Sequence, residues 1–323
     1  MGKKVSAPRR GSLQYWPRKR AQRQHARVRS HSTDVKGLVG FAGYKAGMTQ
    51  IIATDNKKFS PTKGQDISIP VTIIECPPLK VAGIRFYKDN KAYGKAAAAQ
   101  VTFAPSKELS RHRSFKKSGD LEKVSVEDYA YATIILHTQP HLTSIGQKKP
   151  QIFELDFVGS VQEAIDFVKE TKEIKVDEFV KEGQFFDSHS VTTGRGTQGV
   201  VKRFGVSLRS HKSEKSARKA VIGPEGYAKV QYTAPQAGKM GYHLRTEYNK
   251  QILSIQEAEN VQIKGGIVNY GNPKNTVLLV KGSVPGPKKR LITFTQPIRE
   301  DKKASTQPMT IQHIALRSQQ GNQ

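Results

Sequence analysis

Glycines and cations dominate the segment from residue 192 to residue 250. Between Arg195 and Lys219 there are eight Lys or Arg and a single acid, Glu214. The apolar residues of this segment follow neither a helical nor a strand spacing, so no face of it can be buried. Cations neutralise phosphates, and glycines let the backbone lie close to a phosphate chain. The sequence therefore predicts a basic, Gly-rich loop over residues 192–250 that binds a polyanion.

A second cluster of cations lies at the N-terminus. Residues 1–36 hold eleven Lys or Arg against one acid, and they show no apolar period. Tyr15 and Trp16 lie among these cations, and stacking rings mixed with phosphate-seeking charges are typical of an arm that threads into RNA. A solvated, disordered tail is the alternative. Across both segments, the candidate phosphate or base contacts are Arg9, Arg10, Trp16, Arg18, Lys19, Arg20, Arg23, Arg195, Lys202, Arg203, Arg209, Lys212, Arg218, Lys219, Lys239 and Arg245.

Two histidines, His211 and His243, differ from the others because each lies among these cations. Core packing is not expected in such a setting. We therefore expect each imidazole to hydrogen-bond to, or stack on, a nucleotide. A solvent-exposed side chain with no specific contact is the alternative.

Motifs for catalysis or metal binding fail on their spacing. Gly238-Lys239 is followed by Met240, which does not match a phosphate-binding loop. His137 and His141 have the i, i+4 spacing of a helical metal pair, but Pro140 separates them in a region that predicts a strand. Asp187-Ser188-His189 cannot form a triad on a strand, because neighbouring side chains there point to opposite faces. The sequence predicts no catalytic residue, no metal ligand and no cofactor, and it does not predict an enzyme.

Bulk composition restricts the partners further. The chain has 323 residues, 36% of them hydrophobic, and a formal net charge of +27. This length suits about two domains of ~100–200 residues each. The charge indicates nucleic acid or an anionic membrane, and the membrane is the weaker choice because no run of about 18 apolar residues occurs. Cys76 is the single cysteine, which excludes an internal disulfide and favours a reduced, cytosolic compartment. The N-terminus lacks the apolar region of a secretory signal.

The remaining residues predict the elements that must hold these segments. Two short strands are expected within Gly37–Ala53, around Gly43 and Gly47. Further strands are expected at Pro70–Cys76, Val81–Tyr87, Ala132–Thr138, Gln151–Phe157, Val261–Val268, Thr276–Lys281 and Leu291–Thr295. A helix begins after the capping box of Ser160 and Glu163, with Val161, Ala164, Ile165 and Val168 on its apolar face. A short helix is expected at about Val176–Lys181, ending near Gly183.

Charge divides the chain into regions. Residues 120–182 hold thirteen acids against seven Lys or Arg, so this part should face away from a polyanion. We expect a basic N-terminal extension (1–36), a β-domain split between 37–85 and 184–296, an acidic α/β insertion (86–183) and a C-terminal tail (297–323). The basic loop of 192–250 then leaves the β-domain.

Several separated strings resemble one family. They are Arg9–Leu13, Pro17–Ala21, Gly40–Thr49, Gln198–Arg203, Gly241–Glu247 and Leu278–Gly286. In this order they resemble the archaeal and eukaryotic form of the large-subunit ribosomal protein L3 family over nearly the whole chain. Family members usually carry a tryptophan two residues after an Ile-Gly pair at the tip of the central extension. Here Pro224-Glu225-Gly226-Tyr227 follows Ile222-Gly223, so Tyr227 is the candidate replacement. Lys45, in the string Gly40–Thr49, is a further candidate RNA contact.

The resemblance implies a mainly β fold: a six-stranded, Greek-key translation-protein β-barrel with an inserted α/β domain and long basic extensions. It also implies a structural constituent of the large subunit in the cytoplasmic ribosome, which binds large-subunit rRNA and neighbouring ribosomal proteins and is not an independent homo-oligomer. In this family the protein binds early in assembly, near the 3′ part of the large rRNA, and the central extension approaches the peptidyl transferase centre and the aminoacyl-tRNA entry route. An RNA-modifying enzyme and a free chromatin or mRNA binder are the competing hypotheses.

Overall fold

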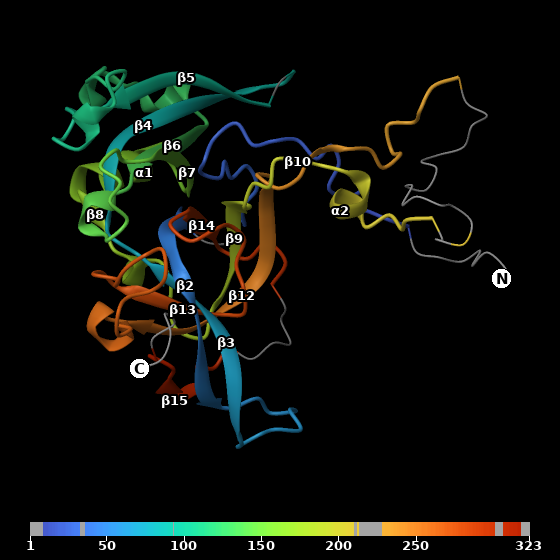
Figure 1. The fold of residues 1–323 in the computed structure, drawn as a ribbon. Coiled ribbons are helices and arrows are strands. Elements are labelled where there is room, and N and C mark those ends of the chain that lie inside the picture. Colours follow the sequence, from blue (N-terminus) through green and yellow to red (C-terminus); the bar gives the residue numbers. More distant parts are fainter. Residues whose placement is uncertain are drawn as a thin grey trace. The chain divides into compact units, whose positions relative to one another are not determined.

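The structure is a computed structural model, which describes residues 9–32, 36–92, 94–209, 212, 228–300 and 306–317. The chain divides into two compact units. Met1–Gln22 and Val191–Leu244 form the first, here called the extension unit, and Arg23–Ser190 and Arg245–Gln323 form the second, the sheet unit. The fold is mainly β, as the sequence predicts (Figure 1).

Strands account for most of the described secondary structure. They are β1 (Gly37–Leu38), β2 (Gly40–Thr54), β3 (Asp66–Glu75), β4 (Leu79–Asn90), β5 (Gly94–Thr102), β6 (Tyr131–His137), β7 (Ile152–Val158), β8 (Glu173–Ile174), β9 (Phe185–Val191), β10 (Thr197–Gln198), β11 (Gly238–Lys239), β12 (Leu244–Gln256), β13 (Val277–Lys281), β14 (Leu291–Thr295) and β15 (Thr310–Ile314). The α-helices are α1 (Val161–Glu170) and α2 (Val200–Phe204). Short 3₁₀ turns lie at Leu109–Arg111, Leu121–Lys123, Val126–Asp128, Pro140–Leu142, Val176–Glu178 and Ala258–Val261.

One sheet of the sheet unit has seven strands in the order β14-β9-β12-β13-β3-β2-β15. In addition, β14 pairs with β2 in antiparallel register, from Leu291 opposite Tyr44 to Thr295 opposite Gly40. This pairing joins the first strand of the order to the sixth. The six strands β14, β9, β12, β13, β3 and β2 are therefore linked through hydrogen bonds in a continuous path.

The long strand β2 differs from the two short strands predicted within Gly37–Ala53. A register shift between Lys45 and Gly47 against β3 lets one strand run through the glycines that looked like interruptions. Gly43 has a packing reason, because a Cβ there would lie 2.7 Å from Cys76 Sγ and 2.9 Å from the carbonyl oxygen of Glu75. The glycines thus mark close strand approach and not the end of a strand.

The other sheet of the unit has the order β1-β7-β6-β4-β5, and β8 pairs with the start of β4. Helix α1 contacts β6 and β4. Its predicted capping box is present, with Ser160 and Glu163 each bonded to the backbone of the other. The four predicted apolar side chains of the helix are buried. Both sequence predictions for this helix are confirmed.

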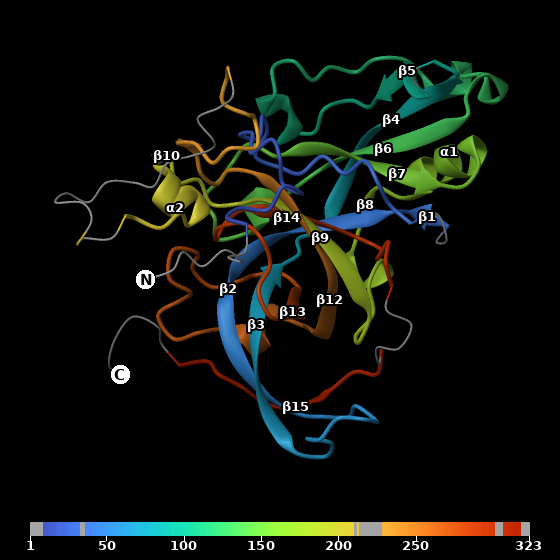
Figure 2. The ribbon, with the colours of Figure 1, turned by 90° about the vertical axis from the view of Figure 1, so that its right-hand side faces the viewer.

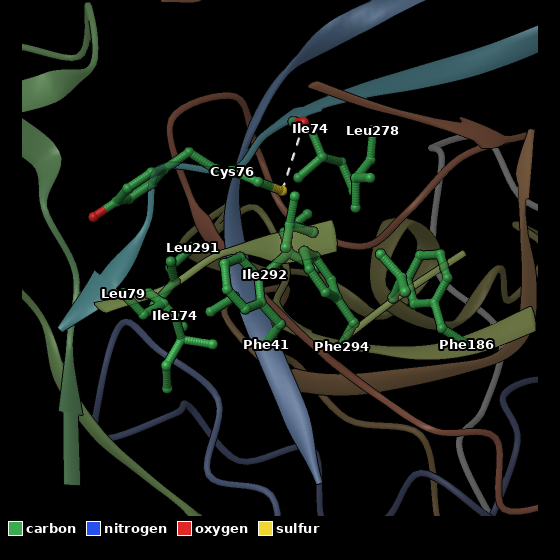
Figure 3. Close-up of a cluster of buried hydrophobic side chains, with 14 of the residues drawn as sticks. Phe41, Ile74, Cys76, Leu79, Ile174, Phe186, Leu278, Leu291, Ile292 and Phe294 are labelled. Carbon is green, nitrogen blue, oxygen red and sulfur yellow. Dashed lines mark hydrogen bonds between the residues drawn. The ribbon is translucent and has the colours of Figure 1, made fainter. Parts of the chain in front are cut away.

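A single hydrophobic cluster draws on both sheets (Figure 3). Phe41 and Phe294 come from the seven-stranded sheet and stack with centroids 6.1 Å apart. Leu79 and Ile174, from β4 and β8, belong to the same cluster. The lone thiol, Cys76, is buried among them. The acidic region therefore shares its core with the seven-stranded sheet inside the sheet unit.

Most predicted strands correspond to observed ones, but Val261–Val268 is wrong. This stretch follows the 3₁₀ turn Ala258–Val261 and contains Gly265 and Gly266, with φ of +78° and +76°. Two consecutive residues with left-handed backbone interrupt the extended conformation of a β-strand. The segment still buries Ile263 and Ile267, which explains the apolar pattern. The predicted helix at Val176–Lys181 is only a 3₁₀ turn, Val176–Glu178.

Candidate nucleic-acid interface

A short two-stranded ribbon forms the base of the basic loop in the extension unit. β10 pairs with β11, placing Thr197 opposite Lys239 and Gln198 opposite Gly238. The Arg195 N–H donates to the Met240 carbonyl oxygen at 2.9 Å, which extends the ribbon. The two ends of the loop are thus held together by backbone bonds. The last residues of the predicted loop, from Leu244 onward, belong to strand β12.

Some glycines at the base of the loop pack closely against other residues, and others face open space. A Cβ on Gly241, whose φ is +74°, would lie 2.0 Å from the Thr193 carbonyl oxygen. A Cβ on Gly238 would lie 2.8 Å from a guanidinium nitrogen of Arg203. Gly196 and Gly205, by contrast, have open space where a Cβ would be. The fold therefore requires a glycine at 241, whereas a Cβ at 238 would meet only the movable end of the Arg203 side chain. Close approach to a phosphate chain remains an expectation for Gly196 and Gly205.

The N-terminal arm packs on the loop base through Phe204. Trp16 stacks on this ring with centroids 5.7 Å apart and planes inclined by 20°. The guanidinium carbon of Arg18 lies 4.2 Å from the Phe204 centroid, and its Nη1 donates to the Arg203 carbonyl oxygen at 2.8 Å. A Cβ on Gly11 would lie 2.5 Å from Phe204 Cδ1. Trp16 and Arg18, both predicted RNA contacts, are half-buried in this internal stack.

Helix α2 carries two cations with different surroundings, the exposed Lys202 and the hydrogen-bonded Arg203. Gly199 and the left-handed Gly205 bound the helix, and Val200 and Phe204 are its buried residues. Lys202 is exposed. Arg203 donates from Nε to the Lys239 carbonyl oxygen at 3.0 Å and from Nη1 to the Gln236 carbonyl oxygen at 2.9 Å. The Arg203 guanidinium therefore ties residues 236–239, which include strand β11, to the helix.

The expectation that His243 would not pack in a core is wrong. Its side chain is 7% exposed, and Nδ1 lies 2.9 Å from the Lys19 carbonyl oxygen. The His243 N–H also donates to Thr192 Oγ1 at 3.2 Å. Cationic neighbours in sequence misled the prediction, because the chain folds back and encloses the ring between the arm and the loop base.

The exposed cations of the extension unit form the surface that could meet a polyanion. These predicted residues are Arg9, Arg10, Lys19, Arg20, Arg195, Lys202, Arg209, Lys212 and Lys239. Three of them are also held internally: Arg9 donates to the Thr233 carbonyl oxygen, Arg20 lies over the Tyr242 ring, and Lys239 donates to Thr197 Oγ1. Such contacts orient cations before a ligand arrives.

Other predicted contacts lie in the sheet unit or outside the described residues. Arg23 is exposed, and Arg245 is half-buried on β12. Lys45 differs from its prediction, because its ammonium donates to the carbonyl oxygens of Val284 (2.7 Å) and Gly286 (3.1 Å). Burial lowers the Lys45 pKa, and this side chain anchors a turn in the fold. The predicted contacts His211, Arg218, Lys219 and Tyr227 lie outside the described residues.

One candidate was missed by the sequence analysis. Tyr232 is 83% exposed and meets Trp16 edge to face, with centroids 6.5 Å apart. An exposed ring beside cations is suited to stacking on a base. The available signal was a lone aromatic near Lys229 in a polar segment.

His189 and Asp187 on β9 make structural hydrogen bonds and form no catalytic triad with each other. His189 contacts Thr246 Oγ1 at 2.9 Å and Thr295 Oγ1 at 3.0 Å, while Asp187 accepts from the N–H groups of Asn249 and Ile298. Among the described residues, no group of three or more His, Cys, Asp or Glu could hold a metal ion. Nor does any helix in the described part of the chain have the length and apolarity needed to cross a membrane.

Comparisons with known proteins agree with the resemblance of the sequence strings. The family model described as Ribosomal protein L3 matches residues 1–130 and 114–321. The large ribosomal subunit protein uL3 of Methanothermobacter thermautotrophicus is 40% identical over 97% of this chain and 98% of its own length. The uL3 proteins of Archaeoglobus fulgidus (42%, covering 98% of this chain and 99% of that protein) and Methanococcus vannielii (38%, 100% of both) are similar. The chain belongs to the ribosomal protein L3 family.

Proposed function

We propose that this chain is a structural constituent of the large ribosomal subunit and binds large-subunit rRNA mainly through its extension unit. The observation that carries the proposal is the exposed cationic surface of that unit, held in place by internal contacts, in a chain of net charge +27. Family membership supports it, since the relatives are named as large ribosomal subunit proteins. The protein is thus a ribosomal protein and not an enzyme, and it works in the cytoplasmic ribosome with neighbouring ribosomal proteins.

The finer fold assignment is part of the proposal. The six linked strands form a Greek-key translation-protein β-barrel, and the pairing of β14 with β2 supports its closure. The acidic region at 86–183 is an α/β insertion in that barrel, supported by α1 and its own sheet. The barrel takes its strands from 37–85 and 184–296, and 1–36 and 297–323 flank it. Within the insertion, residues 120–182 carry the excess of acids, thirteen against seven Lys or Arg, and this part faces away from rRNA.

Two further roles follow from the family resemblance. The protein binds early in subunit assembly, and the loop at 192–250 reaches toward the peptidyl transferase centre and the aminoacyl-tRNA entry route. The ribbon β10–β11 supports this reach, because it fixes the base from which the loop leaves. The narrow base and exposed cations are suited to an extension that enters folded RNA.

Sedimentation tests the proposal directly. A sucrose gradient of a cell extract, probed with an antibody, should place the protein with the large subunit in low salt. Sedimentation only at the top of the gradient would contradict the ribosomal assignment and favour a free nucleic-acid binder.

Salt dependence tests the electrostatic part. If eight phosphates are neutralised, log K for a large-rRNA fragment should fall against log salt with a slope of roughly −6 to −7. A slope near −1 would show that the cations do not neutralise phosphates.

A further inference from the structure

A cavity of about 920 Å³ lies in the sheet unit, and its lining includes none of the predicted RNA contacts. It is lined by residues of the β2–β3 loop, β9, β12, β13 and the segment before β15. The β2–β3 loop is the blue turn at the lower end of both views in Figures 1 and 2. Four lysines contribute to the lining: Lys57, Lys58, Lys250 and Lys281.

Asp55 shapes the loop that carries two of these lysines. Its carboxylate accepts hydrogen bonds from Ser60 Oγ at 2.6 Å, Thr62 Oγ1 at 2.7 Å and the Lys57 N–H at 3.1 Å. These hydrogen bonds lower the pKa of Asp55 to about 2, and the bond from Ser60 contributes most. With its side chain committed to the turn, Asp55 holds the loop in one conformation. The backbone that carries Lys57, Lys58 and Phe59 is therefore fixed beside the cavity.

Two aromatic rings of the lining are exposed. Phe59 is 92% exposed, with Lys58 Nζ 5.6 Å from its centroid. Tyr248 is 43% exposed, and the guanidinium carbon of Arg299 lies 5.2 Å from its centroid. A phenyl ring that stays in contact with water adds no hydrophobic stabilisation to the fold. A nucleobase is a suitable partner because every base has a flat face that stacks on an aromatic ring.

The charges around the cavity are unbalanced. Glu247 pairs with Lys250 at 2.7 Å, which leaves Lys57, Lys58 and Lys281 against the hydrogen-bonded Asp55. Burial lowers the pKa of Lys281, and the nearby Lys57 charge lowers it further. Lys57 and Lys281 both line the cavity, and two ammonium groups at one cavity repel one another. A phosphate between them would remove this repulsion.

We propose that this cavity binds an unpaired rRNA nucleotide, with its phosphate between Lys57 and Lys281 and its base against Phe59 or Tyr248. The inference rests on the proposed function for the source of the RNA, and it adds a second contact surface on the sheet unit. An acidic peptide would use the lysines but leave the exposed rings without a matching partner.

Phe59→Trp supplies a local reporter, because the exposed position tolerates a larger ring. Its emission is measured as the difference from the parental protein, which retains Trp16. We expect a dodecamer of uridine to quench this emission to saturation, and a 12-base-pair RNA duplex or a polyglutamate peptide to quench it much less. Equal or stronger quenching by polyglutamate would overturn the proposal in favour of an acidic protein partner.

Charge variants then test the cavity in the same reporter background. Lys57→Ala with Lys281→Ala should weaken the uridine-dependent quenching by about tenfold. Lys169→Ala with Lys172→Ala removes the same charge from exposed positions of the acidic region and should leave the quenching unchanged. Circular dichroism verifies that both double variants fold. Equal loss in both would show a general charge effect and contradict the site.

The gradient experiment separates the two hypotheses. No quenching by uridine, in a protein that sediments with the large subunit, refutes the cavity and leaves the proposed function intact. Saturable quenching that Lys57→Ala with Lys281→Ala abolishes, in a protein that sediments alone, supports an RNA site and refutes the ribosomal source of its ligand.

Discussion

The Trp16 indole stacks on the Phe204 ring, with centroids 5.7 Å apart, and thereby joins the N-terminal arm to helix α2. Arg18 adds a hydrogen bond to the Arg203 carbonyl oxygen beside this stack. The Ala21 N–H donates to the Tyr242 carbonyl oxygen at 2.8 Å. The extension unit therefore has internal contacts that do not depend on RNA, although its cations repel one another.

Phe204→Ala should release the N-terminal arm. The substitution removes the ring on which Trp16 and Arg18 pack, and loss of a buried phenyl ring costs about 3–5 kcal/mol in a well-packed site. We expect faster hydrogen exchange at the Ala21 N–H and weaker binding to an rRNA fragment. Val201→Ala, at an exposed position of the same helix, is the control. Unchanged exchange at Ala21 in the Phe204 variant would show that the stack does not hold the arm.

Alanine substitutions at Arg203 and Lys202 should have different effects on hydrogen exchange and on RNA binding. Arg203→Ala breaks two bonds to the carbonyl oxygens of Gln236 and Lys239, so we expect faster exchange at 236–240 and weaker RNA binding. Arg203→Lys should restore little, because an ammonium lacks the planar fork of donors. Lys202→Ala should leave exchange unchanged and make the salt slope shallower by about 0.7–0.9 if it loses one phosphate contact. The same exchange profile for both alanine variants would contradict this division.

Glu75→Gln should destabilise the sheet unit. The fully buried carboxylate accepts hydrogen bonds from the Tyr270 hydroxyl, the N–H groups of Lys274 and Asn275, and Asn275 Nδ2. An amide replaces one acceptor oxygen with a donor, which leaves at least one buried donor unpaired. We expect the free energy of unfolding in urea to fall by about 1–3 kcal/mol. Glu122→Gln, outside the core, should change it little.

Acid should destabilise the protein through His189. Burial lowers the His189 pKa from 6.5 to about 4. The unfolded chain therefore takes up a proton at a higher pH than the folded one, so stability is lost as pH falls from about 6.5 to about 4. The loss approaches about 3 kcal/mol if this group acts alone.

Urea unfolding at several pH values between 7 and 4 measures this effect. His189→Gln should be less stable at pH 7, because it disturbs the contacts with Thr246 and Thr295. It should lose less stability on acidification than the parent protein. An identical pH slope in the two proteins would assign the acid sensitivity to other groups.

Local patterns predicted helix α1, the mainly β class and seven of the described strands, which are β2, β3, β4, β6, β7, β13 and β14. The capping box at Ser160 and the apolar spacing of α1 are properties of a few adjacent residues, and such signals survive folding. The failure at Val261–Val268 has a local cause too, since the positive φ of Gly265 and Gly266 outweighs the apolar pattern. Strand β12 was missed because it begins inside the cationic segment, where pairing with β9 and β13 decides the conformation.

The sequence by itself determined the excess of cations, where they cluster along the chain, and the family to which the chain belongs. Only the tertiary structure decided which cations remain available. Arg203, Lys45 and His243 looked like ligand contacts in one dimension, yet each satisfies backbone carbonyl oxygens brought close by folding. The physical reason is that backbone carbonyl oxygens of the folded protein accept hydrogen bonds from the same side chains that could otherwise contact phosphates. Sequence spacing does not show which oxygen will be near each side chain. The lysine and aromatic cavity at the β2–β3 loop arises in the same way, from residues that lie far apart along the chain.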